Sequence, residues 1–224
     1  LVSGRVGTAL DVSSKQKSLR VYNECMQNYI SKVRTAQTIE CEYSLKVLKA
    51  FFENNTAYFV VESHPLLTVS EYVENNNRIS CEQAVKYLYQ MMTFLSLADR
   101  ARFVHCGLKD TSVYIDEEND KIFIDGYESS LTETDTRTST FYALNNYMHV
   151  KCGAKPPSPV CDYFSAGAIL YTLLTRKKPT SDIICDDRFD LFAFEKIADK
   201  SLRELIKKMC CIDGFEYRSF SELL

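Results

Sequence analysis

The sequence has no excess of basic charge and no long apolar run. Its 224 residues include 27 Lys and Arg against 30 Asp and Glu, which gives a net charge of −3. Proteins that bind nucleic acid or an anionic membrane usually present a basic field, so this balance argues against both kinds of partner. No apolar stretch approaches the ~18 residues of a membrane-spanning helix. We therefore expect no nucleic-acid partner and no membrane partner.

The cysteines lack the spacing of a metal site. There are nine of them, an odd number, with no C-x-x-C pair and no cluster of cysteine and histidine. No signal peptide is visible in these residues, and together these features fit reduced, structural thiols. We expect a reducing compartment, the cytoplasm or the nucleus, and no bound metal.

The length allows one large domain or two small lobes that share a cleft. The chain starts at Leu1 and stops inside an apparent helix over residues 219–224. We therefore expect it to be part of a longer protein.

The most informative stretch is residues 103–128. Two short apolar runs, 113–115 and 122–124, flank the polar segment 116–121, a pattern that predicts a β-hairpin. A polar loop, residues 105–112, precedes the hairpin, and Asp125 and Gly126 follow it.

These residues resemble two motifs of the eukaryotic protein kinases, the catalytic loop H-R-D-L-K-x-x-N and the metal-binding D-F-G. The loop reads HCGLKDTS from His105, and the second motif reads DGY from Asp125. Gly107 stands where kinases have the aspartate that handles the substrate proton, and Ser112 stands where an asparagine holds magnesium. Glycine has no carboxylate, and a serine hydroxyl is a weaker ligand for a hard cation. The resemblance therefore implies a pseudokinase, with the kinase fold but without kinase chemistry.

The first 22 residues resemble the opening strands of the kinase domain. They read as two or three strands, and Gly4 and Gly7 resemble a damaged form of the glycine-rich lid over the ATP phosphates. The family's V-A-I-K strand aligns with residues 19–22, which places Tyr22 at the lysine and Arg20 at the small alanine near the adenine. A phenol cannot neutralise phosphate charge, and a shift of one residue, to Val21 or Asn23, would not restore the lysine.

The regulatory helix of the family is expected within residues 23–40. Counting back from the following strand places its glutamate near Val33, with Glu40 or Glu42 as alternatives in a shifted register. Residues 43–52 and 56–62 are predicted to form a strand pair joined by a turn at Asn54 and Asn55.

The second half of the chain resembles the helical lobe more strongly. Ser80 and Gln83 form a capping-box signature that opens an amphipathic helix of about twenty residues. The stretch from Asp162 to Pro179 resembles the buried central helix of the family, in which the aspartate ties down the backbone of the catalytic loop. Arg218 matches the arginine that the family pairs with the glutamate of A-P-E, but Lys151 stands at that glutamate. Arg218 should therefore pair with another acid or be exposed.

The nucleotide pocket is expected to be vestigial. Asp125 is the one first-rank ligand that remains, while Arg20 in the roof and Tyr114 in the floor place large side chains where the family keeps small or aliphatic ones. Arg20 could pair with Asp125 and fill the cleft. Gly126 supplies no ring for the stack that the phenylalanine of D-F-G completes, whereas His105, another member, is retained for packing. We expect ATP and Mg²⁺ binding to be absent or very weak.

The sequence thus predicts an α+β, two-lobed, protein-kinase-like fold, with a small five-stranded β lobe over about 1–62 and a mainly helical lobe over about 63–224. The predicted function is a catalytically inactive scaffold or allosteric regulator of a protein partner, an active kinase being one candidate. Binding surfaces are expected on residues 23–42, on the Ser/Thr-rich segment 129–140, or beneath Lys151. Two alternatives remain: a nucleotide or small-ligand sensor, and an enzyme that uses Asp125 and Lys109 for Mg²⁺-dependent phosphoryl or nucleotidyl transfer.

Overall fold

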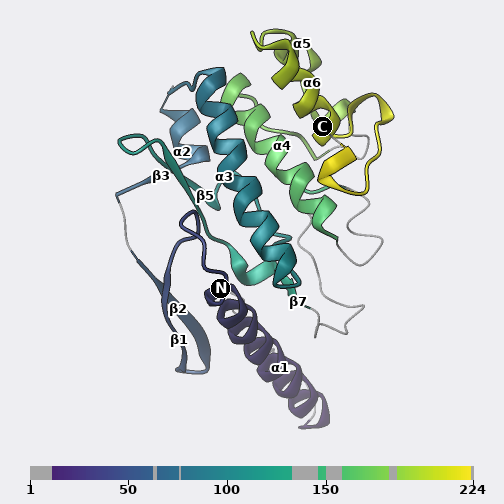
Figure 1. Cartoon of the computed structure of the whole chain (residues 1–224). Helices are drawn as coiled ribbons and strands as arrows, with labels where there is room; N and C mark the ends of the chain where they lie inside the picture. The colour runs from purple at the N-terminus through teal and green to yellow at the C-terminus, as the bar shows by residue number, and fades with distance from the viewer. Residues whose placement is uncertain are drawn as a thin grey trace.

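The computed structural model of the chain describes residues 12–62, 65–75, 77–132, 146–149, 158–181 and 186–222 (Figure 1). Its helices are α1 Val12–Gln37, α2 Val69–Glu74, α3 Cys81–Arg100, α4 Pro159–Thr175, α5 Leu191–Glu195 and α6 Lys200–Met209. Its strands are β1 Val47–Glu53, β2 Thr56–Val61, β3 Leu67–Thr68, β4 Phe103–Val104, β5 Val113–Asp116, β6 Lys121–Ile124 and β7 Leu131–Thr132. Short 3-10 turns, among them η1 Tyr127–Ser129 and η3 Asp186–Arg188, complete the described elements.

The smaller lobe consists of the antiparallel hairpin β1–β2 packed against α1 (Figure 1). The ring of Tyr29 on α1 lies 5.9 Å from that of Phe59 on β2. In the described part of this lobe the sheet has two strands, so the prediction of a five-stranded sheet does not hold for these residues. The predicted strand pair 43–52 and 56–62 is confirmed, although β1 begins four residues later than expected.

The prediction of a strand at residues 18–22 is wrong, because these residues lie inside the 26-residue helix α1. The short run alternates apolar and polar residues, which suggested a strand. Continued along the chain, however, the pattern becomes helical: Tyr29, Val33 and Ala36 follow one another at spacings of four and three and face the interior. Gly4 and Gly7 lie outside the described residues.

The larger lobe is built around α3 and α4, which lie side by side (Figure 1). The predicted helix at residues 81–100 is confirmed, with both hydrogen bonds of the capping box between Ser80 and Gln83. α4 is buried along nearly its whole length, and α6 packs so closely on it that a Cβ on Gly167 would lie 2.6 Å from Cβ of Met209. The two-lobed α+β fold is thus the one expected.

The predicted hairpin after the polar loop is also confirmed. β5 and β6 pair antiparallel, with Val113 opposite Ile124 and Tyr114 opposite Phe123, and β3 adds a third strand beside β5. Val113, Ile122 and Ile124 are fully buried against the helical core. The hairpin therefore fixes the position of the loop that precedes it and of the residues that follow it.

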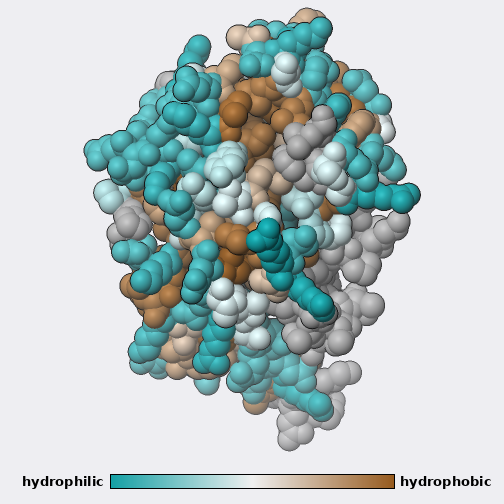
Figure 2. All heavy atoms as spheres, viewed as in Figure 1, coloured by the Kyte–Doolittle hydropathy of each residue, from teal (hydrophilic) through white to brown (hydrophobic). Residues whose placement is uncertain are grey.

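Most of the described cysteines are free thiols, at positions 25, 41, 81, 106, 210 and 211. Cys161 at the start of α4 is disulfide-bonded, which corrects the prediction that all nine are reduced. None of the helices in the described ranges has both the length and the apolarity that a bilayer crossing requires. On the face shown in Figure 2, hydrophilic atoms predominate and apolar atoms form separate areas, one of them over the helical lobe.

Candidate functional site

The site is the polar loop between β4 and β5 together with the segment that follows β6. Asp162 on α4 holds the start of this loop: its Oδ2 accepts the backbone N–H of His105 at 2.8 Å, and its Oδ1 accepts that of Cys106 at 2.9 Å. Burial raises the pKa of Asp162 to about 7, although the two N–H donors oppose this effect. Because both oxygens act as acceptors, we assign the ionised form.

His105 is fully buried and neutral. Its Nδ1 accepts the backbone N–H of Gly107 at 3.2 Å, so the proton sits on Nε2, which donates to the carbonyl oxygen of Asp125 at 3.1 Å. Burial lowers the pKa of His105 to about 4. The imidazole therefore joins the loop to the Asp125 segment and serves as a structural group.

Gly107, which the sequence analysis places at the catalytic aspartate of kinases, has no room for a side chain. A Cβ added there would lie 2.8 Å from the carbonyl oxygen of Gly126 and 3.1 Å from Cβ of Ser129. Contacts under 3.0 Å are essentially never made by real Cβ atoms. The segment after Asp125 thus lies directly against the loop where a carboxylate would have to emerge.

Ser112, which the sequence analysis places at a magnesium-binding asparagine, is 3% exposed and engaged within the loop. Its Oγ accepts the backbone N–H of Lys109 at 2.9 Å, and its proton points to the carbonyl oxygens of Lys109 and Gly107, at 3.1 and 3.2 Å. The hydroxyl therefore closes the turn of the loop, and binding a metal would require it to give up these partners.

Tyr127 supplies the aromatic ring that Gly126 cannot supply to the stack around His105. Gly126 adopts φ +93°, a left-handed conformation that turns the chain, and Tyr127 then enters the interior with no exposed surface. Its ring lies 5.6 Å from His105, 6.4 Å from Phe103 and 6.5 Å from Phe94. Gly126 itself supplies no ring, as expected, but the stack is not left incomplete, because the ring of Tyr127 fills it. The signal that could have shown this was the aromatic residue immediately after the glycine.

Asp125 and Tyr114 remain near the loop. The backbone N–H of Asp125 donates to the carbonyl oxygen of Ser112 at 2.9 Å, and its side chain is half-buried. Tyr114 is half-buried on β5, on the opposite face from the buried Val113 and Ile115. Within the described ranges no group of three or more acidic, histidine or cysteine side chains could hold a metal ion.

Arg20 and Tyr22 do not belong to this site, which corrects two predictions. Both lie on α1: Arg20 is exposed and pairs with Glu24 one turn away at 3.2 Å, and the Tyr22 hydroxyl donates to the carbonyl oxygen of Asn55 in the β1–β2 turn. Arg20 therefore neither roofs a pocket nor pairs with Asp125. The predicted place of the regulatory helix is occupied by α1, which buries Val33 where the glutamate was expected.

The sequence predicts that Arg218 either pairs with another acid or is exposed, and it is exposed. Its backbone N–H donates to the Glu222 carboxylate at 2.9 Å.

A different arginine is buried. Arg188 is 6% exposed and donates to the carbonyl oxygens of Asn146 and Met148, which sequence reasoning missed. Lys151 and residues 133–140 lie outside the described residues.

A second residue that sequence reasoning missed is Lys178, just after α4. Its ammonium lies 2.6 Å from Oγ of Ser70, 3.0 Å from the Glu74 carboxylate and 3.1 Å from that of Asp110. Together these contacts join α2 to the loop. Neither acid is close to Lys178 in sequence, so only the fold brings them together.

Comparison with known proteins agrees with this geometry. The chain matches the family described as "Protein kinase domain" over residues 5–224. "Carbon catabolite-derepressing protein kinase" of Candida glabrata is 26% identical over 99% of this chain, and "Calcium-dependent protein kinase 4" of Plasmodium berghei is 24% identical over 90%. "Probable serine/threonine-protein kinase KIN1 homolog" of Enterocytozoon bieneusi is 24% identical over 74% of this chain. The matches cover 38%, 40% and 29% of those proteins, so this chain spans well under half of their length. The fold, the loop and the match over residues 5–224 together show that the chain belongs to the protein kinase domain family.

Proposed function

We propose that this domain does not catalyse phosphoryl transfer and acts as a protein-binding module, a scaffold or an allosteric regulator of another protein. The observation that carries the proposal is Gly107. The position lacks the carboxylate that orients the substrate hydroxyl, and the carbonyl of Gly126 fills the space that a side chain would need. The relatives are named as kinases, but at 24–26% identity their activity does not transfer to a chain without this residue.

One further feature supports weak or absent binding of ATP and Mg²⁺. The hydroxyl of Ser112 is engaged within the loop, and binding a metal would require it to give up these partners. The obstruction expected from Arg20 is withdrawn, so the proposal rests on Gly107 and Ser112.

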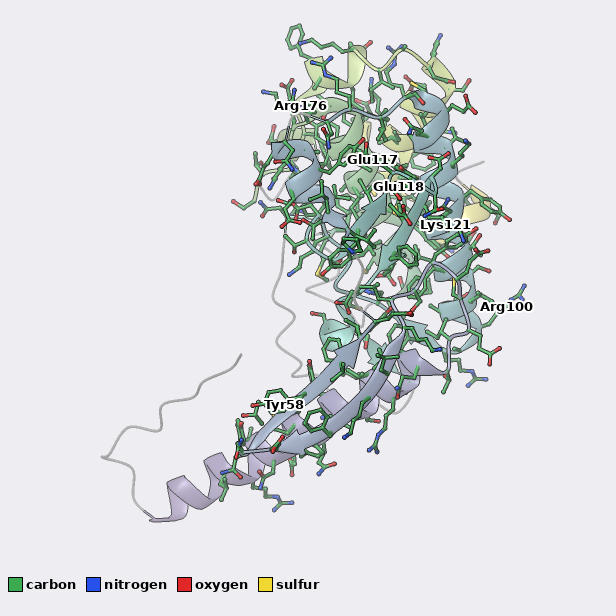
Figure 3. The ribbon with its side chains drawn as sticks, turned by 90° about the vertical axis from the view of Figure 1, so that its left-hand side faces the viewer. Tyr58, Arg100, Glu117, Glu118, Lys121 and Arg176 are labelled. Atoms are coloured by element: carbon green, nitrogen blue, oxygen red, sulfur yellow. The ribbon has the colours of Figure 1, made fainter. Side chains whose placement is uncertain are left out.

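The expected partner is a protein, with an active kinase as one candidate, and we expect neither nucleic acid nor membrane. Support for a binding role comes from the face of the β1–β2 hairpin that points away from α1, where Tyr58 stands out to solvent (Figure 3). Tyr58 is 40% exposed and Val60 43%, and Leu48 on the neighbouring strand is 56% exposed. We propose the cytoplasm or the nucleus as the compartment. The six free thiols support a reducing compartment, whereas the disulfide of Cys161 is of a kind that is rare there.

A thermal-shift titration tests the nucleotide part of the proposal. The chain is titrated with ATP and ADP, each with and without Mg²⁺ or Mn²⁺, beside the variant Asp125→Ala. A ligand that binds only the folded state must raise the unfolding temperature. We expect no shift in any condition. A metal-dependent shift that Asp125→Ala abolishes would overturn the proposal that ATP and Mg²⁺ binding is weak or absent.

Because Asp125 is retained, a nucleotide sensor and an enzyme are alternative functions, and the same titration tests both. A nucleotide sensor would show the metal-dependent shift without any transfer of phosphate. An enzyme that uses Asp125 and Lys109 would show both. The titration therefore separates the binding module from the sensor, and an assay of phosphate transfer separates the sensor from the enzyme.

A further inference from the structure

Tyr127 does more than complete the aromatic stack, because its hydroxyl reaches out of the stack toward the other lobe. The oxygen lies 2.6 Å from the carbonyl oxygen of Ile124 and 2.6 Å from Oγ of Ser44. A carbonyl only accepts, so the phenol proton goes to Ile124 and the hydroxyl of Ser44 donates to the phenol oxygen. Burial raises the pKa of Tyr127, which keeps the phenol protonated.

Ser44 belongs to the segment that joins α1 to β1. The residues on either side of it add to the edge of β6: the N–H of Ile124 donates to the carbonyl of Tyr43, and the N–H of Leu45 donates to the carbonyl of Ile124, both at 2.9 Å. The carbonyl of Ile124 thus accepts from both Leu45 and Tyr127. The Ile124 carbonyl therefore binds both the end of the α1–β1 segment, at Leu45, and the aromatic stack, at Tyr127.

Other contacts lead from the same place to α1. The helix itself contacts η1, the turn that carries Tyr127. On the outer side, Lys121 of β6 pairs with Glu42 at 2.6 Å, but this pair is largely exposed and adds little. The partly buried hydrogen bond between Tyr127 and Ser44 therefore ties the stack to the segment after α1 through side chains.

We propose that the Tyr127–Ser44 hydrogen bond is a latch that holds α1 in one position against the helical lobe, with no ligand required. The ring anchors the latch in the stack with Phe94, Phe103 and His105, and the hydroxyl transmits that anchorage to the chain that leaves α1. If the latch is broken, α1 and the hairpin packed on it should open more often than the rest of the molecule. The latch does not depend on the lack of catalysis, so its failure would leave that proposal standing.

A double-mutant cycle read by hydrogen exchange tests the latch. The variants are Tyr127→Phe, Ser44→Ala and both together, and the readout is the protection of the backbone amides of residues 26–37 in α1. Tyr127→Phe keeps the ring, so the stack should survive. Ser44→Ala should lower protection of α1 by about tenfold, the effect of one lost hydrogen bond. Tyr127→Phe removes the same bond and also the bond to the Ile124 carbonyl, so it should lower protection at least as much. Because the bond between Tyr127 and Ser44 is already lost in Tyr127→Phe, the double variant should lose no more than that single variant.

Tyr147→Phe is the matched control. Tyr147 is also a buried tyrosine, and its hydroxyl lies 3.1 Å from that of Thr172 on α4, inside the helical lobe. This variant should leave the protection of α1, relative to that of α3, unchanged. Unchanged protection of α1 in both single variants, or a clearly greater loss in the double variant than in Tyr127→Phe, would overturn the latch.

Discussion

At the scale of single residues, the site uses its side chains for packing and for hydrogen bonds within the loop. Gly107 leaves no room for a side chain, Ser112 closes a turn, and His105 is neutral at the centre of an aromatic stack. These residues now hold the loop and the Asp125 segment together. Changes at these positions should therefore act first on stability, and two predictions follow from this.

The first concerns pH. Burial lowers the pKa of His105 to about 4 from an ordinary value of 6.5, so between these values the unfolded chain binds more protons than the folded one. The stability that the neutral imidazole contributes is present above pH 6.5 and is lost as the pH falls toward 4. The advantage of the wild type over His105→Gln in free energy of unfolding should shrink by roughly 2–3 kcal/mol from pH 7 to pH 4.

The comparison must be made as a difference, because Asp162 acts in the opposite direction. Its raised pKa makes the folded state the better proton binder between pH 3.8 and 7, so that its own contribution grows as the pH falls. Urea unfolding of both proteins at several pH values gives the difference directly. The variant His149→Gln, a half-buried histidine outside the stack, is the control. An equal loss of stability at pH 7 and pH 4 for His105→Gln would contradict the prediction.

The second concerns Gly107. Gly107→Ala should lower the free energy of unfolding by roughly 1–3 kcal/mol, because its Cβ would overlap the carbonyl of Gly126. Gly214→Ala separates crowding from backbone strain: that position has φ +71° but no atom within 4 Å, so only the strain of about 1 kcal/mol is expected. If Gly107→Ala is as stable as the wild type, the segment can move aside, and the case against a carboxylate at this position fails.

At the scale of elements, the sequence predicted best where a local signal and a burial pattern agree. α3 carries both a capping box and a helical apolar face, and β5–β6 shows two apolar runs around a polar turn. α1 was mistaken because five alternating residues look the same in a strand and at the edge of a helix. Arg188 and Lys178 could not be found at all, since their partners are distant in sequence. Tyr127 was missed because its position in the stack depends on the left-handed turn at Gly126.

The β1–β2 turn gives a prediction at this scale. Asn54 and Asn55 have φ values of 48° and 55°, so both central residues are left-handed, as in a type I′ turn. Glycine adopts this conformation without a steric cost, so Asn55→Gly should raise the free energy of unfolding by about 0.5 kcal/mol. The bond from Tyr22 to the backbone carbonyl of residue 55 is kept. Asn55→Ala should lower stability in the same thermal or urea experiment, and a loss of stability in Asn55→Gly would contradict the turn assignment.

At the scale of the whole molecule, the chain has the kinase fold, and we propose that it does not use that fold for catalysis. The anchor of the loop at Asp162, the aromatic stack and the central helices are intact. The smaller lobe, by contrast, consists in its described part of one helix and one hairpin. If the proposed Tyr127–Ser44 latch holds α1 against the helical lobe, the domain can present fixed surfaces to a partner without any nucleotide, as the proposed binding function requires.

An assay with γ-labelled ATP tests whether this domain transfers phosphate, which we propose it does not. The chain at high concentration is incubated with Mg²⁺ or Mn²⁺ and general protein substrates, beside the variant Asp125→Asn. We predict that no label enters either the substrates or the chain itself above the level of the variant. Incorporation that depends on the metal and disappears in Asp125→Asn would contradict the account and establish the domain as an enzyme.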